Sequence, residues 1–339
     1  MLQAVSNPPN PWLSTHVEWL DQPPAARLEV YEEESRSILA TNDSPDISFT
    51  YSVNPYRGCQ HACAYCYARP THQFLGFGAG TDFETRVVVK TNAAELLRRE
   101  LASRRWRAGR HTIAFSGVTD CYQPLEACYE LTRACLAVAH EFRHPVAIIT
   151  KGALVRRDAG LLAAMAARGG ARVFLSIPFA DDATARAIEP LASAPSARFE
   201  TLRRLADAGI PCGAAVAPLI PGLNDSHVPE ILERAKAAGA TSAFLVPLRL
   251  PAEVLPVFRE RLDQAFPDRA AKVFAAVREL RGGRLNEPSF GTRMRGLGPR
   301  WQAVHDLFHL TCRRLGLDHA RAEAPAPAES RQRLLFEDA

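Results

Sequence analysis

The stretch NPYRGCQHACAYCYARP (residues 54–70) contains three cysteines spaced as C-x3-C-x2-C, namely Cys59, Cys63 and Cys66. Three thiolates within eight residues can surround one metal cluster from a single loop. Iron–sulfur clusters are normally held by four cysteines, and structural zinc sites are closed by four ligands. No fourth cysteine stands beside these three, so the spacing indicates a soft-ligand cluster with one open coordination position, which is typical of metal sites that carry out chemistry.

Segments with strand and helix patterns alternate along the chain beyond this loop, each apolar run being followed by apolar residues at helical spacing. Repeated strand–helix units favour a parallel sheet, because parallel strands need crossover connections. Right-handed crossovers without a return strand curl such a sheet into a barrel or part of one. We therefore predict an α/β fold, a partial (β/α)6 TIM-like barrel, with a doubly wound open sheet as the alternative. The predicted strands lie in ISFTYSVNP (47–55), HTIAFSG (111–117), PVAIIT (145–150), ARVFLSI (171–177), IPCGAAVAPLI (210–220) and TSAFLVPL (241–248).

The cysteine loop resembles the signature of the radical S-adenosylmethionine (radical SAM) superfamily, C-x3-C-x-aromatic-C, with Tyr65 in the aromatic position. FSGVTDCYQPLE (115–126), ITKGALVRRD (149–158) and LIPGLND (219–225) look like the branch that contains spore photoproduct lyase and many uncharacterised bacterial proteins. The resemblance covers roughly residues 27–315, most of the chain. It implies the same partial barrel that the alternation of strands and helices predicts.

The resemblance also implies cofactors. Cys59, Cys63 and Cys66 would hold a [4Fe–4S] cluster, and S-adenosyl-L-methionine (SAM) would chelate its fourth iron. One electron from the reduced cluster would cleave SAM to methionine and a 5′-deoxyadenosyl radical, which abstracts a hydrogen from the substrate. We therefore expect a lyase-like radical SAM enzyme that takes its electron from an external donor such as flavodoxin or ferredoxin.

Relatives place their SAM-binding groups at the carboxyl ends of the barrel strands, where ligands gather in parallel α/β folds. By resemblance, Asp120 receives the SAM amino group, although an aspartate here also suits a cap of the helix expected near Pro124. Lys151 and Ser176 match a lysine and a serine that contact the SAM carboxylate, although a strand-end lysine is usually just solvated. The implied SAM-binding set is Tyr65, Ser116, Gly117, Thr119, Asp120, Lys151 and Ser176, with Pro218, Ile220 and Val246 either as a wall around the adenine or as part of ordinary turns.

The chain departs from the spore photoproduct lyase pattern at the thiol that returns a hydrogen to the product radical. The matching position is Gly117, and the nearest thiol is Cys121, directly after Asp120. Either Cys121 is the catalytic hydrogen donor or the reaction differs, so we do not expect thymine-dimer splitting. Cys128 and Cys135 stand seven residues apart in one predicted helix, hence on one face, where we expect core packing.

Composition indicates a globular protein with one large domain and extensions, or with two ordinary domains. The chain has 339 residues, 47% hydrophobic content and a formal net charge of +4, a mild basic bias that does not by itself indicate nucleic-acid binding. It has no apolar run long enough to span a membrane, and its N-terminus lacks the pattern of a secretory signal. We therefore expect a cytoplasmic, reducing location, which keeps thiolates reduced.

The chain end carries a short motif of its own. QRLLFE (332–337) resembles the peptide by which replication and repair proteins dock on the bacterial DNA sliding clamp, with Gln332–Phe336 as its core. Leu334, Leu335 and Phe336 would enter a hydrophobic groove on that partner, unless the segment folds back on the barrel. The domains that we expect are a Pro-rich arm (1–26), the core barrel (27–250), a C-terminal helical extension (251–317) and a low-complexity, disordered tail (318–339).

Arg293, Arg295 and Arg300 stand in FGTRMRGLGPRW (290–301), a glycine-rich loop suited either to clamp nucleic-acid phosphates or to form salt bridges onto the barrel. The leading hypothesis is thus a radical SAM enzyme for nucleic-acid repair or modification, including DNA repair. A protein or small-metabolite substrate is the alternative. A non-catalytic iron–sulfur module is the third hypothesis, although an electron carrier would normally complete its cluster with a fourth cysteine.

Overall fold

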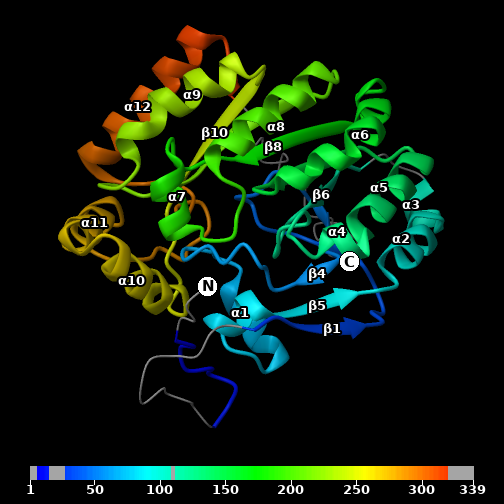
Figure 1. The fold of residues 1–339 in the computed structure, drawn as a ribbon, viewed down its shortest axis with the longest axis horizontal. Helices are drawn as coiled ribbons and strands as arrows, with labels where there is room; N and C mark the ends of the chain where they lie inside the picture. Colours follow the sequence, from blue (N-terminus) through cyan, green and yellow to red (C-terminus); the bar gives the residue numbers. More distant parts are fainter. Residues whose placement is uncertain (1–5, 15–26, 108–110, 320–339) are drawn as a thin grey trace, which may run out of the picture.

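The computed structural model describes residues 6–14, 27–107 and 111–319, and an eight-stranded sheet forms its centre (Figure 1). The strand order is β11-β10-β9-β8-β7-β6-β3-β2, and every neighbouring pair is parallel except β2 with β3. The six predicted strands are β3 and β6 to β10, and their parallel arrangement is confirmed. In the described ranges β2 and β11 do not pair with each other, so the barrel is partial. The bounds are β2 (Leu39–Thr41), β3 (Tyr51–Val53), β6 (Ile113–Phe115), β7 (Val146–Thr150), β8 (Ala171–Ser176), β9 (Cys212–Leu219), β10 (Ser242–Pro247) and β11 (Asp318–His319).

Helices in the connections cover the outer face of this sheet (Figure 1). In α8, Phe199, Leu202 and Leu205 recur at helical spacing and are buried in the main apolar core together with strand residues such as Val173 and Val216. The helices are α2 (Ala93–Leu101), α3 (Arg104–Arg107), α4 (Glu126–Tyr129), α5 (Leu131–Glu141), the 3-10 segment η2 (Ala153–Asp158), α6 (Ala159–Ala166), α7 (Asp182–Ile188), α8 (Pro195–Asp207), η3 (Asp225–His227) and α9 (Val228–Ala237).

The helix predicted to carry both Cys128 and Cys135 is broken in two, so the expectation that they share a face is wrong. The break falls at Glu130, whose backbone has φ 50° and ends α4. The Glu126 carboxylate stabilises the break, because it accepts a hydrogen bond of 2.9 Å from the backbone N–H of Thr132 in the first turn of α5. Cys128 is exposed as a result, whereas Cys135 is buried.

A second sheet of three strands, in the order β1-β5-β4, leads into the cysteine loop. The pattern at 85–90 suggests only a short edge strand, yet β5 is the central strand here, parallel to β1 and antiparallel to β4. Val87, Val88 and Val89 of β5 are all buried, which explains its central position. The bounds are β1 (Glu29–Glu33), β4 (Tyr56–Arg57), η1 (Arg69–Leu75), α1 (Thr81–Thr85) and β5 (Arg86–Lys90).

The described chain beyond β10 is helical apart from the short β11, as its pattern predicts, with α10 (Val254–Ala265), α11 (Pro267–Leu280) and α12 (Gly298–Leu315). α10 packs against α7, and α12 packs against α9 (Figure 1).

The described part of the N-terminal arm lies on the segment before β5, where Asn7 Oδ1 accepts hydrogen bonds from the backbone of Gly80 and Asp82 at 3.0 and 3.2 Å. None of the helices in the described ranges combines the length and apolar character needed to cross a membrane.

Candidate functional site

The cysteine loop forms successive tight turns directly after β4. Backbone hydrogen bonds from Ala62 N to Cys59 O and from Cys66 N to Cys63 O, both 3.3 Å, close two of these turns. Cys66 packs in one apolar cluster with Cys59 and in a second with Cys63, so the three thiols are neighbours. All three are free of disulfides, and Cys59 and Cys63 are only 6% and 7% exposed.

Burial raises the pKa of all three thiols, and for Cys59 the nearby Asp120 carboxylate and the other two thiols act in the same direction. The Lys151 ammonium acts the other way on Cys63 and Cys66. Buried thiolates are costly without a cation, so this donor set suits a metal group. In the part of the chain that is described, no three His, Cys, Asp or Glu side chains converge on a single metal ion. A cluster binds each cysteine through a different iron, so three separate sulfur donors fit a [4Fe–4S] cluster with one open iron.

A fully buried arginine supports the loop from the inside. Arg69 donates hydrogen bonds of 3.1 and 2.8 Å to the Cys63 carbonyl and forms an ion pair of 2.5 Å with Glu84. Arg261 of α10 donates to the second Glu84 oxygen at 3.2 Å. Buried charges are tolerated when they are paired and hydrogen-bonded, so this network fixes the loop rigidly to the protein interior.

A second buried ion pair holds the loop from the α7–α8 connection. The Tyr65 hydroxyl donates to Glu189, and Glu189 pairs with Arg198, both side chains being fully buried. Arg198 also donates to the Ser176 carbonyl at 2.8 Å. The residue directly before Cys66 is therefore tied to the carboxyl end of β8.

The predicted SAM-carboxylate residues Lys151 and Ser176 lie together beside this loop. Lys151 Nζ donates a hydrogen bond of 3.0 Å to Ser176 Oγ, which in turn donates to the Ala217 carbonyl at 2.9 Å. The ammonium also lies 5.4 Å from the centroid of the Tyr65 ring and 3.9 Å from Glu189 Oε1. Three strand ends and the cysteine loop thus meet at one place, although the role of the lysine and the serine stays a prediction.

Asp120 connects the end of β6 to the end of β7 and to the cysteine loop. Its oxygens accept hydrogen bonds from the Thr150 hydroxyl at 2.5 Å and from the backbone of Lys151 and Tyr122 at 2.8 and 2.9 Å, and His61 Nδ1 lies 3.2 Å away. Burial favours a higher pKa for Asp120, but His61 and these donors outweigh it and hold the pKa well below its usual range. Asp120 does not cap α4, and its contact with the SAM amino group stays a prediction.

The other predicted residues after β6 also touch the cysteine loop. The Gly117 carbonyl accepts a hydrogen bond of 2.8 Å from the Tyr67 hydroxyl, and Thr119 Oγ1 donates to the Gly58 carbonyl at 2.5 Å. Ser116 adopts φ 80°, an uncommon conformation for a residue with a side chain, which turns the chain sharply after β6. This connection therefore lies directly on the loop.

The predicted apolar wall is divided between the interior and the strand ends. Ile220 is fully buried in the same apolar cluster as Cys63 and Tyr65, so it supports the loop from inside. Pro218 and Val246 are only half-buried, at the ends of β9 and β10. Contacts between these residues and an adenine ring stay a prediction.

Cys121 is fully buried in the main apolar core. Burial, with the nearby Asp120 carboxylate, raises the pKa of its thiol well above the usual range. A hydrogen donor must reach the substrate radical, so this burial favours a packing role. We propose no catalytic step for Cys121.

Two of the three arginines that the sequence singles out in the 290–301 loop already have carboxylate partners. Arg293 Nε lies 2.6 Å from Asp46 Oδ2, and Arg300 Nε lies 3.0 Å from Glu279 Oε2. The salt-bridge alternative is therefore what the structure shows for both of them. Arg295 is exposed.

Arg249, which the sequence reasoning missed, has no carboxylate partner among the described residues. It is the second residue after β10, its guanidinium lies 5.9 Å from the centroid of the Tyr67 ring, and its Nη1 atom is 3.9 Å from Met294 Sδ. Burial, followed by repulsion from Arg293, lowers its pKa. Its position at a strand end, like those of Lys151 and Ser176, is the signal that could have identified it.

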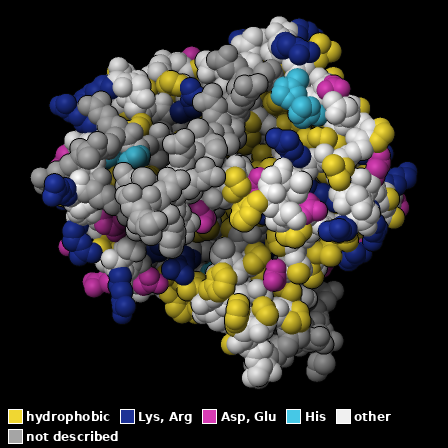
Figure 2. Space-filling view, turned by 180° about the vertical axis from the view of Figure 1, so that it is seen from behind, with side chains coloured by type: hydrophobic (Ala, Val, Ile, Leu, Met, Phe, Trp, Pro, Cys, Tyr) yellow, Lys and Arg dark blue, Asp and Glu magenta, His cyan; other side chains and the backbone are white. Residues whose placement is uncertain are grey.

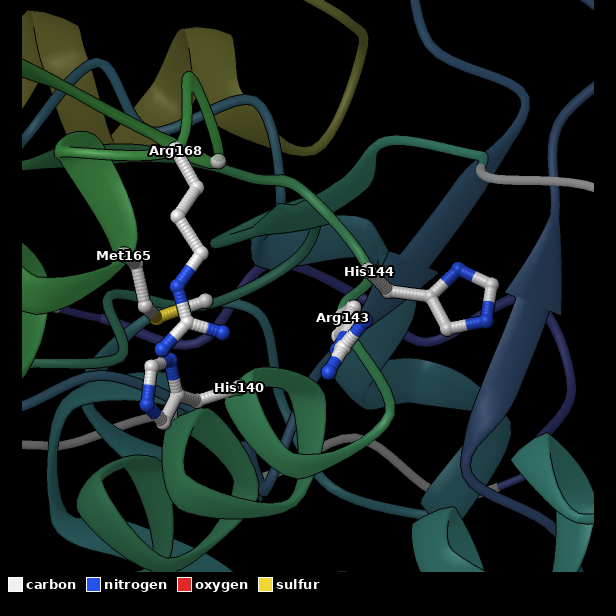
Figure 3. Close-up of a pocket in the computed structure, with 6 residues that line it drawn as sticks. His140, Arg143, His144, Met165 and Arg168 are labelled. Atoms are coloured by element: carbon white, nitrogen blue, oxygen red, sulfur yellow. The ribbon is translucent and has the colours of Figure 1, made fainter.

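A separate cavity of about 410 Å³ lies at the opposite end of the sheet, where β7 and β8 begin (Figure 3). His140, Arg143, Met165 and Arg168 line it, and in Figure 3 the Arg168 side chain points toward His140. None of the predicted site residues lines this cavity. It also lies at the C-terminal ends of α5 and α6, where cations are favoured by the helix dipole without any ligand.

Comparison with known proteins gives consistent results. A family model described as the radical SAM superfamily matches residues 53–235. An uncharacterised protein of Mycobacterium tuberculosis is 39% identical over 252 residues, 74% of this chain and 72% of that protein. An uncharacterised protein of Methanocaldococcus jannaschii is 33% identical over 200 residues, 59% of this chain and 71% of that protein.

Among solved structures, spore photoproduct lyase complexed with dinucleoside spore photoproduct superimposes with a TM-score of 0.59 at 17% identity, covering 86% of this chain and 81% of that chain. This likeness concerns the fold. The family match spans more than half of the chain, so the protein belongs to the radical SAM superfamily.

Proposed function

We propose that the protein cleaves SAM reductively at a [4Fe–4S] cluster held by Cys59, Cys63 and Cys66. When bound, the cluster supplies one electron to SAM, which yields methionine and a 5′-deoxyadenosyl radical that abstracts a hydrogen from the substrate. The Lys151 ammonium and the Ser176 hydroxyl, 3.0 Å apart, offer a charge-assisted site for the SAM carboxylate. This pair beside a loop of three thiols, two of them buried and Cys66 half-buried, is the observation that carries the proposal.

The test is anaerobic reconstitution with iron and sulfide, followed by dithionite and SAM. We expect 5′-deoxyadenosine from the wild-type protein and none from Cys63→Ala. Cys128→Ala is the matched control, because this exposed cysteine lies outside the loop and its loss should change nothing. Wild-type protein that shows the cluster spectrum but forms no 5′-deoxyadenosine would contradict the proposal.

We further propose that the substrate is nucleic acid, which the enzyme repairs or modifies in a lyase-like reaction. Support comes from two exposed aromatic rings, Tyr67 (52% exposed) near Arg249 and Phe290 (60% exposed). Arg249 offers the cation, because Arg293 beside Phe290 already pairs with Asp46. Proteins bind single strands by stacking bases on aromatic rings and pairing phosphates with cations. Tyr67 follows Cys66 directly, so this surface lies next to the cluster loop.

Fluorescence anisotropy with short labelled single-stranded DNA and RNA tests this substrate class. Each phosphate contact adds about −0.7 to the slope of log K against log salt for single strands, so Arg249→Gln should weaken binding and flatten the slope by about that amount. Arg300→Gln is the control, because Glu279 already holds that guanidinium. Equal binding by wild type and Arg249→Gln would remove Arg249 from the phosphate contact. Lack of binding by the wild-type protein would instead favour the alternative of a protein or small-metabolite substrate.

Two partners are also proposals. An external donor such as flavodoxin or ferredoxin would supply the electron. The clamp-docking peptide Gln332–Phe336 lies outside the described residues, and binding of a peptide of residues 330–339 to purified sliding clamp tests it. Lack of binding at high micromolar concentration would exclude clamp docking.

A further inference from the structure

A pair of histidines on α12 lies apart from the site described above. His305 and His309 are four residues apart, hence neighbours on one face of the helix. Their Nε2 atoms are 2.9 Å apart, the distance of a hydrogen bond in which one ring donates and the other accepts, and their ring centroids are 4.2 Å apart. The His305 side chain is 40% exposed and His309 is half-buried, and Figure 2 shows histidine side chains gathered at the surface on the side where α12 lies.

We propose that His305 and His309 bind a divalent transition metal of square-planar or octahedral preference, such as Ni²⁺ or Cu²⁺. With metal–nitrogen bonds of about 2.05 Å, the length usual for zinc–histidine bonds, a nitrogen separation of 2.9 Å corresponds to an angle of about 90° at the metal. That is the angle between adjacent ligands in square-planar and octahedral sites. A tetrahedral zinc site would need the two nitrogens about 3.3 Å apart.

The surroundings of the pair suit a metal site open to solvent. Asp306 Oδ1 lies 3.9 Å from His305 Nδ1, the ring nitrogen that faces away from the proposed metal, and a nearby carboxylate makes a histidine a more basic ligand. In the described ranges no third His, Cys, Asp or Glu joins the pair, so water would fill the remaining positions. The Trp301 ring centroid lies 5.5 Å from that of His305, close enough for a bound paramagnetic ion to quench its fluorescence.

Titration of the untagged, reconstituted protein with Ni²⁺ under anaerobic conditions tests the proposal, because the cluster then occupies the thiols that would compete for the metal. We expect calorimetry to show one Ni²⁺ bound per chain and Trp301 fluorescence to fall in parallel. His305→Ala and His309→Ala should each weaken binding on the order of a hundredfold, the advantage that a second linked ligand gives. Trp301→Phe should keep the heat of binding and lose the fluorescence change.

His140→Gln is the matched control, a histidine on a different helix whose replacement should leave Ni²⁺ binding unchanged. If either alanine variant fails to fold, His305→Gln and His309→Gln keep a polar side chain of similar helix propensity. Binding as tight in the single variants as in wild type would overturn the proposal. Tighter binding of Zn²⁺ than of Ni²⁺ would overturn the inferred coordination geometry.

Discussion

Replacing Glu189 by glutamine should destabilise the protein strongly, because it leaves the Arg198 guanidinium charged and fully buried without its carboxylate partner. Arg198 keeps its hydrogen bond of 2.8 Å to the Ser176 carbonyl, but a neutral amide cannot balance its charge. Removing one partner of a buried ion pair typically costs about 3–5 kcal/mol. We therefore expect Glu189→Gln to lower the free energy of unfolding by about that amount.

Urea unfolding followed by circular dichroism measures this loss. Glu200→Gln is the control: its carboxylate pairs with Arg203 on the exposed face of α8, so we expect only a small change. A double variant, Glu189→Leu with Arg198→Met, should recover most of the loss, because both buried charges are then absent. If Glu189→Gln unfolds at the same urea concentration as wild type, the ion pair does not hold the loop in place.

Three further outcomes follow from burial and charge. Burial lowers the pKa of His72 from 6.5 to about 4, so the stability that this neutral ring contributes is complete above pH 6.5 and is lost as the pH falls to 4. Urea unfolding should show a loss of up to about 3 kcal/mol over this window that is absent from His72→Gln. Leu202→Ala, in the core, should cost about 2–5 kcal/mol in the same assay, and Leu191→Ala, at an exposed position, much less. Lys151→Met should weaken SAM binding to reconstituted protein by about 10- to 150-fold, the value of a hydrogen bond to a charged group; unchanged affinity would remove Lys151 from the SAM site.

The strand–helix alternation is a local pattern, and the parallel strands that it predicts are confirmed. The cysteine spacing is a local pattern too, and its role as a cluster site stays a prediction. Each parallel strand is a short apolar run, so β6 to β10 stand out without any knowledge of their neighbours. The break between α4 and α5 was missed because apolar spacing continues through Glu130. It depends on Glu126 capping the next helix from six residues away, which periodicity does not register.

The long-range contacts that hold the loop were missed for a different reason. Tyr65 and Glu189 are 124 residues apart, and Glu84 and Arg261 are 177 apart, so only the folded chain brings them together. A charged residue with a distant partner looks in sequence like any solvated one. The sequence therefore indicated the ligands of the candidate cluster but not the scaffold around them.

The shared carboxylate of Glu84 has a consequence for how the enzyme matures in the cell. Its two cations come from the cysteine loop and from α10, and Arg261 of α10 follows Glu84 by 177 residues. The ribosome therefore releases the cysteines long before the helix that completes their support. We expect iron and sulfide to be installed after synthesis is nearly finished, and truncated chains that end before α10 to take up iron poorly.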